Sequence, residues 1–127
     1  IKREKTEQPD DGKRLIPLLT GKGKNPSLNR ALYWNTPNNW GPTGPGIAAT
    51  CAIRQGDWKL IYYYETGAKE LFNLKDDLGE ATNLALTNPE KVNELSGKLG
   101  KFLRKSGGQR PLFKATGKPA PWPDETF

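Results

Sequence analysis

The chain lacks histidine and methionine altogether, and it contains only one cysteine, Cys51, in 127 residues. The lack of histidine excludes imidazole acid and base catalysis, Ser-His and Cys-His dyads and imidazole metal ligands. A single cysteine excludes an internal disulfide and a cysteine-rich zinc site, and we expect Cys51 to be a small buried hydrophobic residue. Because residue 1 is isoleucine and no initiator methionine is present, we expect the sequence to be a segment of a longer protein.

Strongly apolar residues are scarce as well. Leu, Ile, Val and Phe together make up about a fifth of the chain, which is close to the lower limit for a folded domain. Four Trp and four Tyr add material for a core, whereas 14 Gly and 11 Pro indicate that loops and turns take a large share. No apolar run approaches the roughly 18 residues of a membrane-spanning helix, so we expect no membrane contact.

The net charge of +6 is concentrated at the two ends of the chain. Residues 1–30 and residues 101–127 each carry an excess of four positive charges, whereas the aromatic middle is nearly neutral. A nucleic-acid-binding protein normally gathers Lys and Arg on one face with aromatic residues between them. We therefore expect no nucleic-acid partner, and we expect the basic flanks to be solvated or to pack against an acidic neighbour.

The middle of the chain has the pattern of an antiparallel sheet. Alternating apolar and polar residues predict strands at 31–36, 50–54, 58–64 and 69–74. Short turns separate the last three strands, which makes them antiparallel neighbours. Residues 37–46 contain three Pro and three Gly and therefore predict a long exposed loop.

A long helix is predicted near the C-terminus. Asn88 is a candidate N-cap, followed by Pro89 at the first helical position and Glu90 in the first turn. An apolar stripe at helical spacing consists of Val92, Leu95, Leu99, Phe102 and Leu103. Gly107 and Gly108 end the helix. The predicted fold class is α+β, with a small four-stranded antiparallel sheet packed against one long C-terminal helix and with long loops.

The expected domain limits follow from composition. Residues 1–11 are charged and aperiodic, as in a connector, and residues 12–110 hold the predicted domain. This domain opens with one short helical turn at residues 15–19. Residues 111–127 contain three closely spaced prolines and predict an extended C-terminal tail that packs only if Trp122 finds a pocket.

The residue patterns that usually carry chemistry are weak here. Asp76, Asp77 and Glu80 form a loose acidic cluster, but the neighbouring Gly79 favours a turn over a metal site. The tyrosines at 62–64 alternate between the two faces of a strand, which favours core and surface positions over a platform for sugar rings. The sequence thus offers neither a catalytic residue nor a set of metal ligands.

Four linked phrases nevertheless stand in a specific order and spacing. They are Asp11-Gly12 with residues 15–19 (Leu-Ile-Pro-Leu-Leu), residues 30–34 (Arg-Ala-Leu-Tyr-Trp), residues 52–61 (Ala-Ile-Arg-Gln-Gly-Asp-Trp-Lys-Leu-Ile) and residues 70–85 (Glu-Leu-Phe-Asn-Leu-Lys-Asp-Asp-Leu-Gly-Glu-Ala-Thr-Asn-Leu-Ala). Over about residues 10–110 this series resembles the C-terminal region of the type I sulfatases. Leu78 is a departure, because the family more often has Pro there, and it should affect only the rigidity of the turn.

The resemblance implies an activity whose chemistry lies outside this chain. Type I sulfatases are sulfuric ester hydrolases that use a formylglycine, made from Cys or Ser in a Cys/Ser-x-Pro-x-Arg motif, beside a calcium ion in the larger N-terminal domain. That motif is absent, since residues 51–55 lack the Pro and residues 106–110 have Gly in its place. We therefore expect this chain alone to be inactive, with calcium and formylglycine in an N-terminal catalytic domain of the same parent. The resemblance also favours a periplasmic or secreted parent.

The resemblance further implies that loops of this subdomain wall the substrate pocket of the whole enzyme. The candidate substrate-binding residues are Trp34, Asn35, Asn38, Asn39, Trp40 and Arg54. Asn and Trp suit the hydroxyl groups and ring faces of a sugar, so a sulfated carbohydrate or an aryl sulfate is the expected ligand. Two alternatives stay open: a plain surface loop with two packing tryptophans, and a free-standing module that binds carbohydrate or an acidic partner.

Overall fold

The computed structural model describes residues 16–21, 29–39, 41 and 47–126. The chain divides into two compact units, residues 1–30 and residues 31–127, and each is described by itself. The predicted connector at residues 1–11 lies outside the described residues.

The first unit contains one short helix, α1 (Ile16–Leu19). Both the backbone nitrogen and the hydroxyl of Thr20 donate hydrogen bonds to the carbonyl oxygen of Ile16, at 3.0 and 2.8 Å. These bonds close a single helical turn, so the short helix predicted at this place is confirmed.

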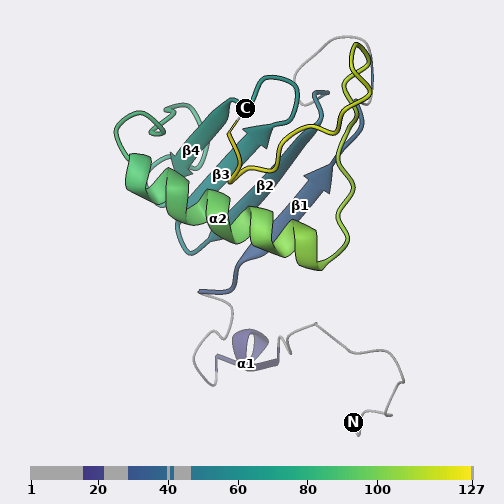
Figure 1. Ribbon diagram of the computed structural model, residues 1–127. Helices are drawn as coiled ribbons and strands as arrows, with labels where there is room; N and C mark the ends of the chain where they lie inside the picture. Colours follow the sequence, from purple (N-terminus) through teal and green to yellow (C-terminus); the bar gives the residue numbers. More distant parts are fainter. Residues whose placement is uncertain (1–15, 22–28, 40, 42–46, 127) are drawn as a thin grey trace, which may run out of the picture. The chain divides into compact units, whose positions relative to one another are not determined.

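The second unit is built on a four-stranded antiparallel sheet with strand order β1-β2-β3-β4 (Figure 1). The strands are β1 (Leu32–Thr36), β2 (Thr50–Gln55), β3 (Trp58–Tyr63) and β4 (Lys69–Asn73). All four predicted strands are confirmed, and their observed ends differ from the predicted ones by a single residue. Gly56 and Asp57 form the two-residue turn between β2 and β3, where Gly56 has a φ of 59° that glycine adopts without strain.

The long helix α2 (Pro89–Lys105) lies across one face of the sheet, which we call the inner face (Figure 1). The core consists of inner-face side chains of the strands, chiefly Cys51, Ile53, Leu60, Tyr62 and Leu71, packed on Val92, Leu95, Leu99 and Leu103 of the helix. Alternation along the strands and the helical stripe together predicted this core, and the α+β fold class is confirmed.

The two ends of α2 differ in how well the sequence predicted them. Asn88 stands at the N-cap position, but its side chain makes no capping hydrogen bond. Its amide nitrogen instead donates to the Leu84 carbonyl oxygen at 3.2 Å and to the Thr87 hydroxyl at 2.9 Å, which turns the side chain toward the preceding turn. The C-terminal end is as predicted, because Gly107 has a φ of 68° and Gly108 donates to the Leu103 carbonyl oxygen at 2.8 Å.

Phe102 is the one member of the predicted apolar stripe that is not buried, with 39% of its surface exposed. Its ring stacks on that of Tyr33 in β1, with ring centroids 3.8 Å apart and an angle of 3° between the planes. Phe102 therefore extends the helix–sheet contact to the first strand at the margin of the core.

The segment after α2 is folded rather than extended. Leu112 and Pro119 form an antiparallel bridge, and Phe113 donates to the Lys118 carbonyl oxygen at 2.8 Å, which closes a tight turn that we call the C-terminal hairpin (residues 112–119). The chain then returns along α2 on the inner face as a strap, residues 120–125 (Figure 1). Trp122 in the strap is only 7% exposed. It therefore occupies a pocket in the core, which was the condition for packing of this segment.

Among the described residues, neither helix has the length and apolar character that crossing a bilayer requires.

Candidate functional site

The structure places the predicted site residues in three different environments. Trp34 and Arg54 lie on the outer face of the sheet, away from α2. Trp34 stands opposite Ala52 and is 48% exposed, and Arg54 stands opposite Leu32 on the same face. Trp34 and Arg54 are therefore diagonal neighbours on an exposed surface, as the strand register requires.

Asn35 points to the inner face, one position along from Trp34. Its amide oxygen accepts a hydrogen bond from the Tyr64 hydroxyl at 2.8 Å, and its amide nitrogen donates to the Gln109 carbonyl oxygen at 2.7 Å. This side chain thus joins the end of β1 to the residue after β3 and to the segment that follows α2. Both functional atoms of its amide are engaged within the fold.

Asn38 and Asn39 follow directly after β1, and Trp40 lies outside the described residues. The Asn39 amide oxygen accepts a hydrogen bond from the backbone nitrogen of Ala49 at 2.7 Å, which ties the two ends of the long loop together. Asn38 is exposed. The structure therefore brings Asn38 and Asn39 together at one end of the sheet and separates them from Trp34 and Arg54.

A cleft of about 460 Å³ opens beside Asn38 and Asn39, and we call it the hairpin cleft. It is lined by Pro37, Asn38, Asn39, Ala49, Tyr64 and Glu65 on one side and by Pro111, Leu112, Phe113 and Lys114 on the other. Its volume falls within the range of small-molecule sites. Residues 111–114 were missed by sequence reasoning, which placed them in an extended tail. The turn residue Gly117, with a φ of 67°, is the signal in the sequence that indicates a hairpin.

Tyr64 is the fully buried residue that lines the hairpin cleft, and Cys51 lies beside it in the core. Burial raises the pKa of Tyr64 well above its ordinary value, and the neighbouring Cys51 adds to this rise. Burial likewise raises the pKa of Cys51 to about 12, although the Tyr64 hydrogen bond opposes the change. Cys51 is therefore a protonated, buried thiol at neutral pH, and it is the small hydrophobic residue that the sequence predicted.

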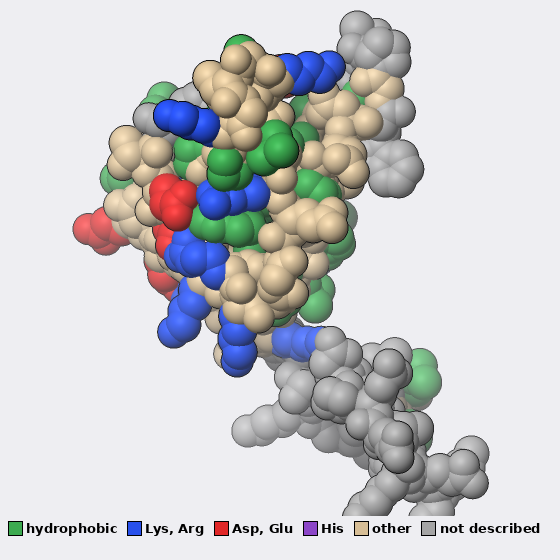
Figure 2. Space-filling model, turned by 45° about the vertical axis from the view of Figure 1, so that its right-hand side comes forward, with side chains coloured by type: hydrophobic (Ala, Val, Ile, Leu, Met, Phe, Trp, Pro, Cys, Tyr) green, Lys and Arg blue, Asp and Glu red, His purple; other side chains and the backbone are tan. Residues whose placement is uncertain are grey.

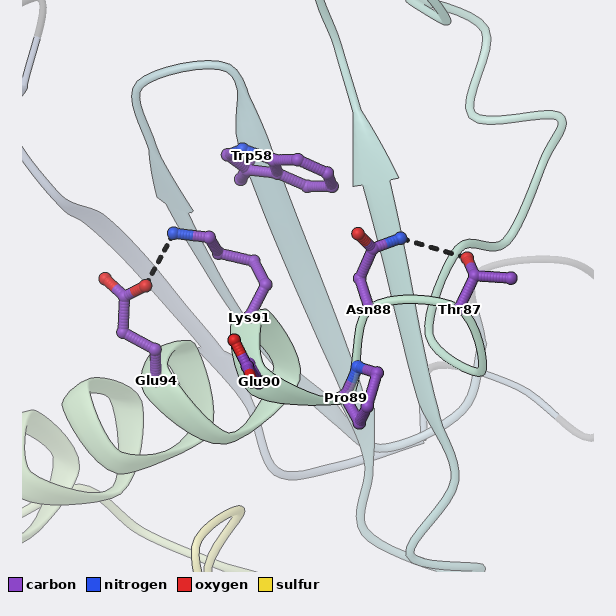
Figure 3. Close-up of a pocket in the computed structure, with 7 residues that line it drawn as sticks. All are labelled: Trp58, Thr87, Asn88, Pro89, Glu90, Lys91 and Glu94. Carbon is purple, nitrogen blue, oxygen red and sulfur yellow. Dashed lines mark hydrogen bonds and ion pairs between the residues drawn. The ribbon is translucent and has the colours of Figure 1, made fainter.

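A second cleft, of about 450 Å³, lies where α2 begins (Figure 3). Trp58 comes from the start of β3, and the other lining residues, Thr87, Asn88, Pro89, Glu90, Lys91 and Glu94, come from the start of the helix (Figure 3). The ammonium group of Lys91 pairs with the Glu94 carboxylate at 2.5 Å, and Asn88 bonds to Thr87. Most polar groups of this cleft thus satisfy one another, which is typical of a helix start rather than of a ligand site.

The acidic cluster after β4 forms a turn. The Asp77 carboxylate accepts hydrogen bonds from the backbone nitrogens of Ala81 and Thr82, at 3.1 and 2.8 Å, and these bonds lower its pKa. Glu80 pairs with Lys59 at 2.5 Å. Within the part of the chain that the structure describes, no three His, Cys, Asp or Glu side chains gather in a way that could hold a metal ion.

Comparisons with known proteins agree with the resemblance found in the sequence. No family model matches the chain. A curated sulfatase of Formosa agariphila is 27% identical over 121 residues, which cover 89% of this chain and 22% of that protein. An uncharacterized sulfatase of Schizosaccharomyces pombe is 47% identical over 47 residues, which cover 35% of this chain and 8% of that protein.

A solved sulfatase structure is also similar to this chain. BT4656, determined in complex with its substrate D-glucosamine-2-N,6-O-disulfate, is 28% identical, with a TM-score of 0.58 over 80% of this chain and 21% of that chain. The chain thus spans about a fifth of the length of the Formosa agariphila sulfatase and of BT4656. These likenesses confirm the resemblance to the C-terminal subdomain of the sulfatases.

Proposed function

We propose that this chain serves as the C-terminal subdomain of a sulfatase, where it completes the fold and helps to wall the substrate pocket. The observation that carries the proposal is the match along 89% of the chain to a sulfatase of which it spans 22%. The four-stranded sheet with one long helix, and the likeness in fold to BT4656, support the same assignment.

In this proposal the hydrolysis of the sulfate ester takes place on residues outside the chain. The chain has no histidine and no Cys/Ser-x-Pro-x-Arg motif, and its one thiol is buried with a pKa raised to about 12. The described residues do not fit a calcium site either. In this proposal formylglycine and calcium belong to an N-terminal catalytic domain, as the resemblance to the sulfatases implies. That domain is the main partner that we assign to this chain, in a periplasmic or secreted parent protein.

The hairpin cleft is the part of this subdomain best formed to contact substrate. It combines the amides of Asn38 and Asn39 with apolar side chains, and this combination suits the hydroxyl groups and the CH faces of a sugar. The substrate named for BT4656 is a sulfated glucosamine, which supports a sulfated saccharide as the substrate class here. An aryl sulfate is the simpler substrate with which to test turnover.

The proposal is tested by two linked measurements. The 127-residue chain, assayed with 4-nitrophenyl sulfate and calcium, is expected to give no turnover, and turnover by the purified chain would contradict the proposal. The gene product that contains this sequence is expected to carry a Cys/Ser-x-Pro-x-Arg motif upstream of Ile1. A product with that motif should hydrolyse sulfate esters, and replacement of its Cys or Ser by Ala should abolish the activity.

A second candidate function is a binding module for carbohydrate that acts without a catalytic domain. The hairpin cleft favours it, because the described residues that line the cleft come from one compact unit of this chain. A gene product without the upstream motif, together with saturable glycan binding by the chain alone, would support this second function instead.

A further inference from the structure

We propose that the hairpin cleft binds a charged saccharide unit and that Lys114 holds an anionic substituent other than the ester that is cleaved. This inference rests on the proposed function, because the catalytic groups lie outside the chain and the reacting ester must lie beside them. Whatever part of the substrate reaches the hairpin cleft is therefore a different part.

The two walls of the cleft come from distant parts of the sequence but are held in fixed positions. Asn39 bonds to Ala49 on one side, and Asn35 joins β1 to Gln109 just before the second wall begins. On the other side, the guanidinium of Arg110 donates to the Ala120 carbonyl oxygen at 2.9 Å and lies 4.6 Å from the centre of the Trp122 ring. The cleft is thus preorganised, which reduces the entropy lost when a ligand binds.

The lining of the cleft has the composition of a sugar site. Leu112 is 63% exposed beside the half-buried Phe113, so an apolar surface faces the cleft mouth. The CH face of a pyranose ring would cover this surface, and the Asn38 amide and the Glu65 carboxylate would take hydroxyl groups. Burial of exposed apolar surface and pairing of rim polar groups would both favour binding.

The charge around Lys114 favours an anion. Within the described residues, Lys114 and the nearby Lys118 make no ion pair, whereas both acidic residues of the last 27, Asp124 and Glu125, are paired with arginines. Residues 101–127 carry six Lys and Arg against two Asp and Glu. Lys and Arg also predominate over Asp and Glu on the face shown in Figure 2. The hairpin itself carries Lys114 and Lys118 and no acidic residue, and Glu65 belongs to the other wall of the cleft. A sulfate or carboxylate group would therefore meet positive charge on the hairpin wall.

Lys118 supplies a matched control for Lys114. Both lysines are exposed and lie on the C-terminal hairpin, but only Lys114 lines the cleft. Lys114→Gln and Lys118→Gln therefore remove the same charge from the same element. Because both side chains are exposed, we expect both variants to fold, which amide spectra would verify.

The experiment is a titration of the ¹⁵N-labelled 127-residue chain with D-glucosamine-2-N,6-O-disulfate, with unsulfated glucosamine in parallel. We expect saturable amide shifts at residues 38, 113 and 114 with the sulfated sugar and much weaker binding of the unsulfated one. Loss of the charge-assisted contact in Lys114→Gln should weaken binding about fivefold or more, whereas Lys118→Gln should change it less than about twofold.

Three results would overturn the inference: no saturable shifts at the cleft, equal binding of the sulfated and unsulfated sugars, or equal losses in the two lysine variants. These results would remove the hairpin cleft as a substrate contact but would leave the assignment as a sulfatase subdomain in place, because that assignment depends on the upstream motif and on the activity of the longer gene product. In that longer product, Lys114→Gln should raise KM for a disulfated sugar and leave kcat nearly unchanged.

Discussion

Ser96 carries the only buried side-chain polar atom without a hydrogen-bond partner among the described residues. It lies on the buried face of α2 and is 2% exposed. An unpaired buried hydroxyl costs about 1–3 kcal/mol, and serine is also a weaker helix former than alanine. Ser96→Ala should therefore raise the free energy of unfolding by about 1 kcal/mol, measured by urea denaturation.

Ser106 provides the control for this prediction. It is exposed just after α2, and its hydroxyl donates to the Leu103 carbonyl oxygen at 3.3 Å. Ser106→Ala should shift the free energy of unfolding by less than about 0.5 kcal/mol. A loss of stability in Ser96→Ala would show instead that its hydroxyl is satisfied in solution.

At this scale the sequence predicted which face each strand residue occupies, but not its partners. The two-residue period of a strand puts Tyr33 and Asn35 on the face opposite Trp34, and their contacts with Phe102 and Tyr64 show that they lie there. It could not reveal that Asn35 bonds to Gln109, since this contact spans 74 positions and depends on the path of the chain after α2. Lys114 was missed as a cleft residue for the same reason.

The two glycines of α2, Gly97 and Gly100, look alike in the sequence but differ in how closely other residues pack against them. Helix propensity alone makes Gly97 and Gly100 each about 1 kcal/mol less favourable than Ala. A Cβ atom at Gly97 would meet nothing within 4 Å, whereas one at Gly100 would overlap the Asp124 carboxylate. The helix needs Gly100 because the strap passes directly over it, and the Asp124 carboxylate there pairs with Arg104.

Substitution by alanine should therefore have opposite effects at the two glycines. Gly97→Ala should raise the free energy of unfolding by about 0.5–1 kcal/mol. Gly100→Ala should lower it by about 1–3 kcal/mol, because Asp124 must move and its pairing with Arg104 is disturbed. Thermal and urea unfolding of the two variants would measure this, and equal shifts of the same sign would contradict the observed path of the strap.

The elements themselves were predictable because their signals are local. Strand alternation, the two-residue turn at Gly56-Asp57 and the Gly107 helix end depend on neighbouring residues only. The C-terminal hairpin and strap have no such periodicity. Their order comes from long-range contacts, such as the hydrogen bond from the Tyr62 hydroxyl to the Pro121 carbonyl oxygen at 3.1 Å.

At the scale of the whole molecule, the strap completes a core that the sheet and helix leave unfinished. Ala120 and Trp122 belong to the same buried cluster as Leu60 and Leu99. This explains how a chain with few aliphatic residues forms a core, since the last segment contributes an aromatic side chain to it. The compact unit, residues 31–127, therefore includes residues 111–127, which the composition of the sequence predicted to be a separate tail.

Removal of the Trp122 side chain should destabilise the whole unit. Trp122→Ala should lower the free energy of unfolding by about 3–5 kcal/mol, because it leaves a large cavity and removes the ring on which Arg110 lies. Trp34→Ala is the control, since Trp34 is half exposed on the outer face and should cost less than about 1 kcal/mol. Similar losses in both variants, measured by urea denaturation, would contradict the packed position of the strap.

The buried hydroxyl and thiol groups make the stability of the molecule sensitive to alkaline pH. Burial raises the pKa of Cys51 from 9.0 and that of Tyr62 from 10.0, in each case to about 12, and also raises the pKa of Tyr64. A group whose pKa is higher in the folded state than in the unfolded state contributes full stability below its unfolded pKa. That contribution is lost as the pH rises toward the folded pKa.

The urea midpoint should consequently be constant between about pH 7 and 9 and should fall steadily between about pH 9.5 and 11.5. Ionisation of Tyr62 would also remove the proton that it donates to the Pro121 carbonyl oxygen and so release the strap. Tyr62→Phe should be less stable at neutral pH, because it lacks this bond, but its midpoint should fall less steeply with pH. A midpoint that stays constant up to pH 11.5, or an equal slope in Tyr62→Phe, would show that these groups ionise without cost in the folded protein.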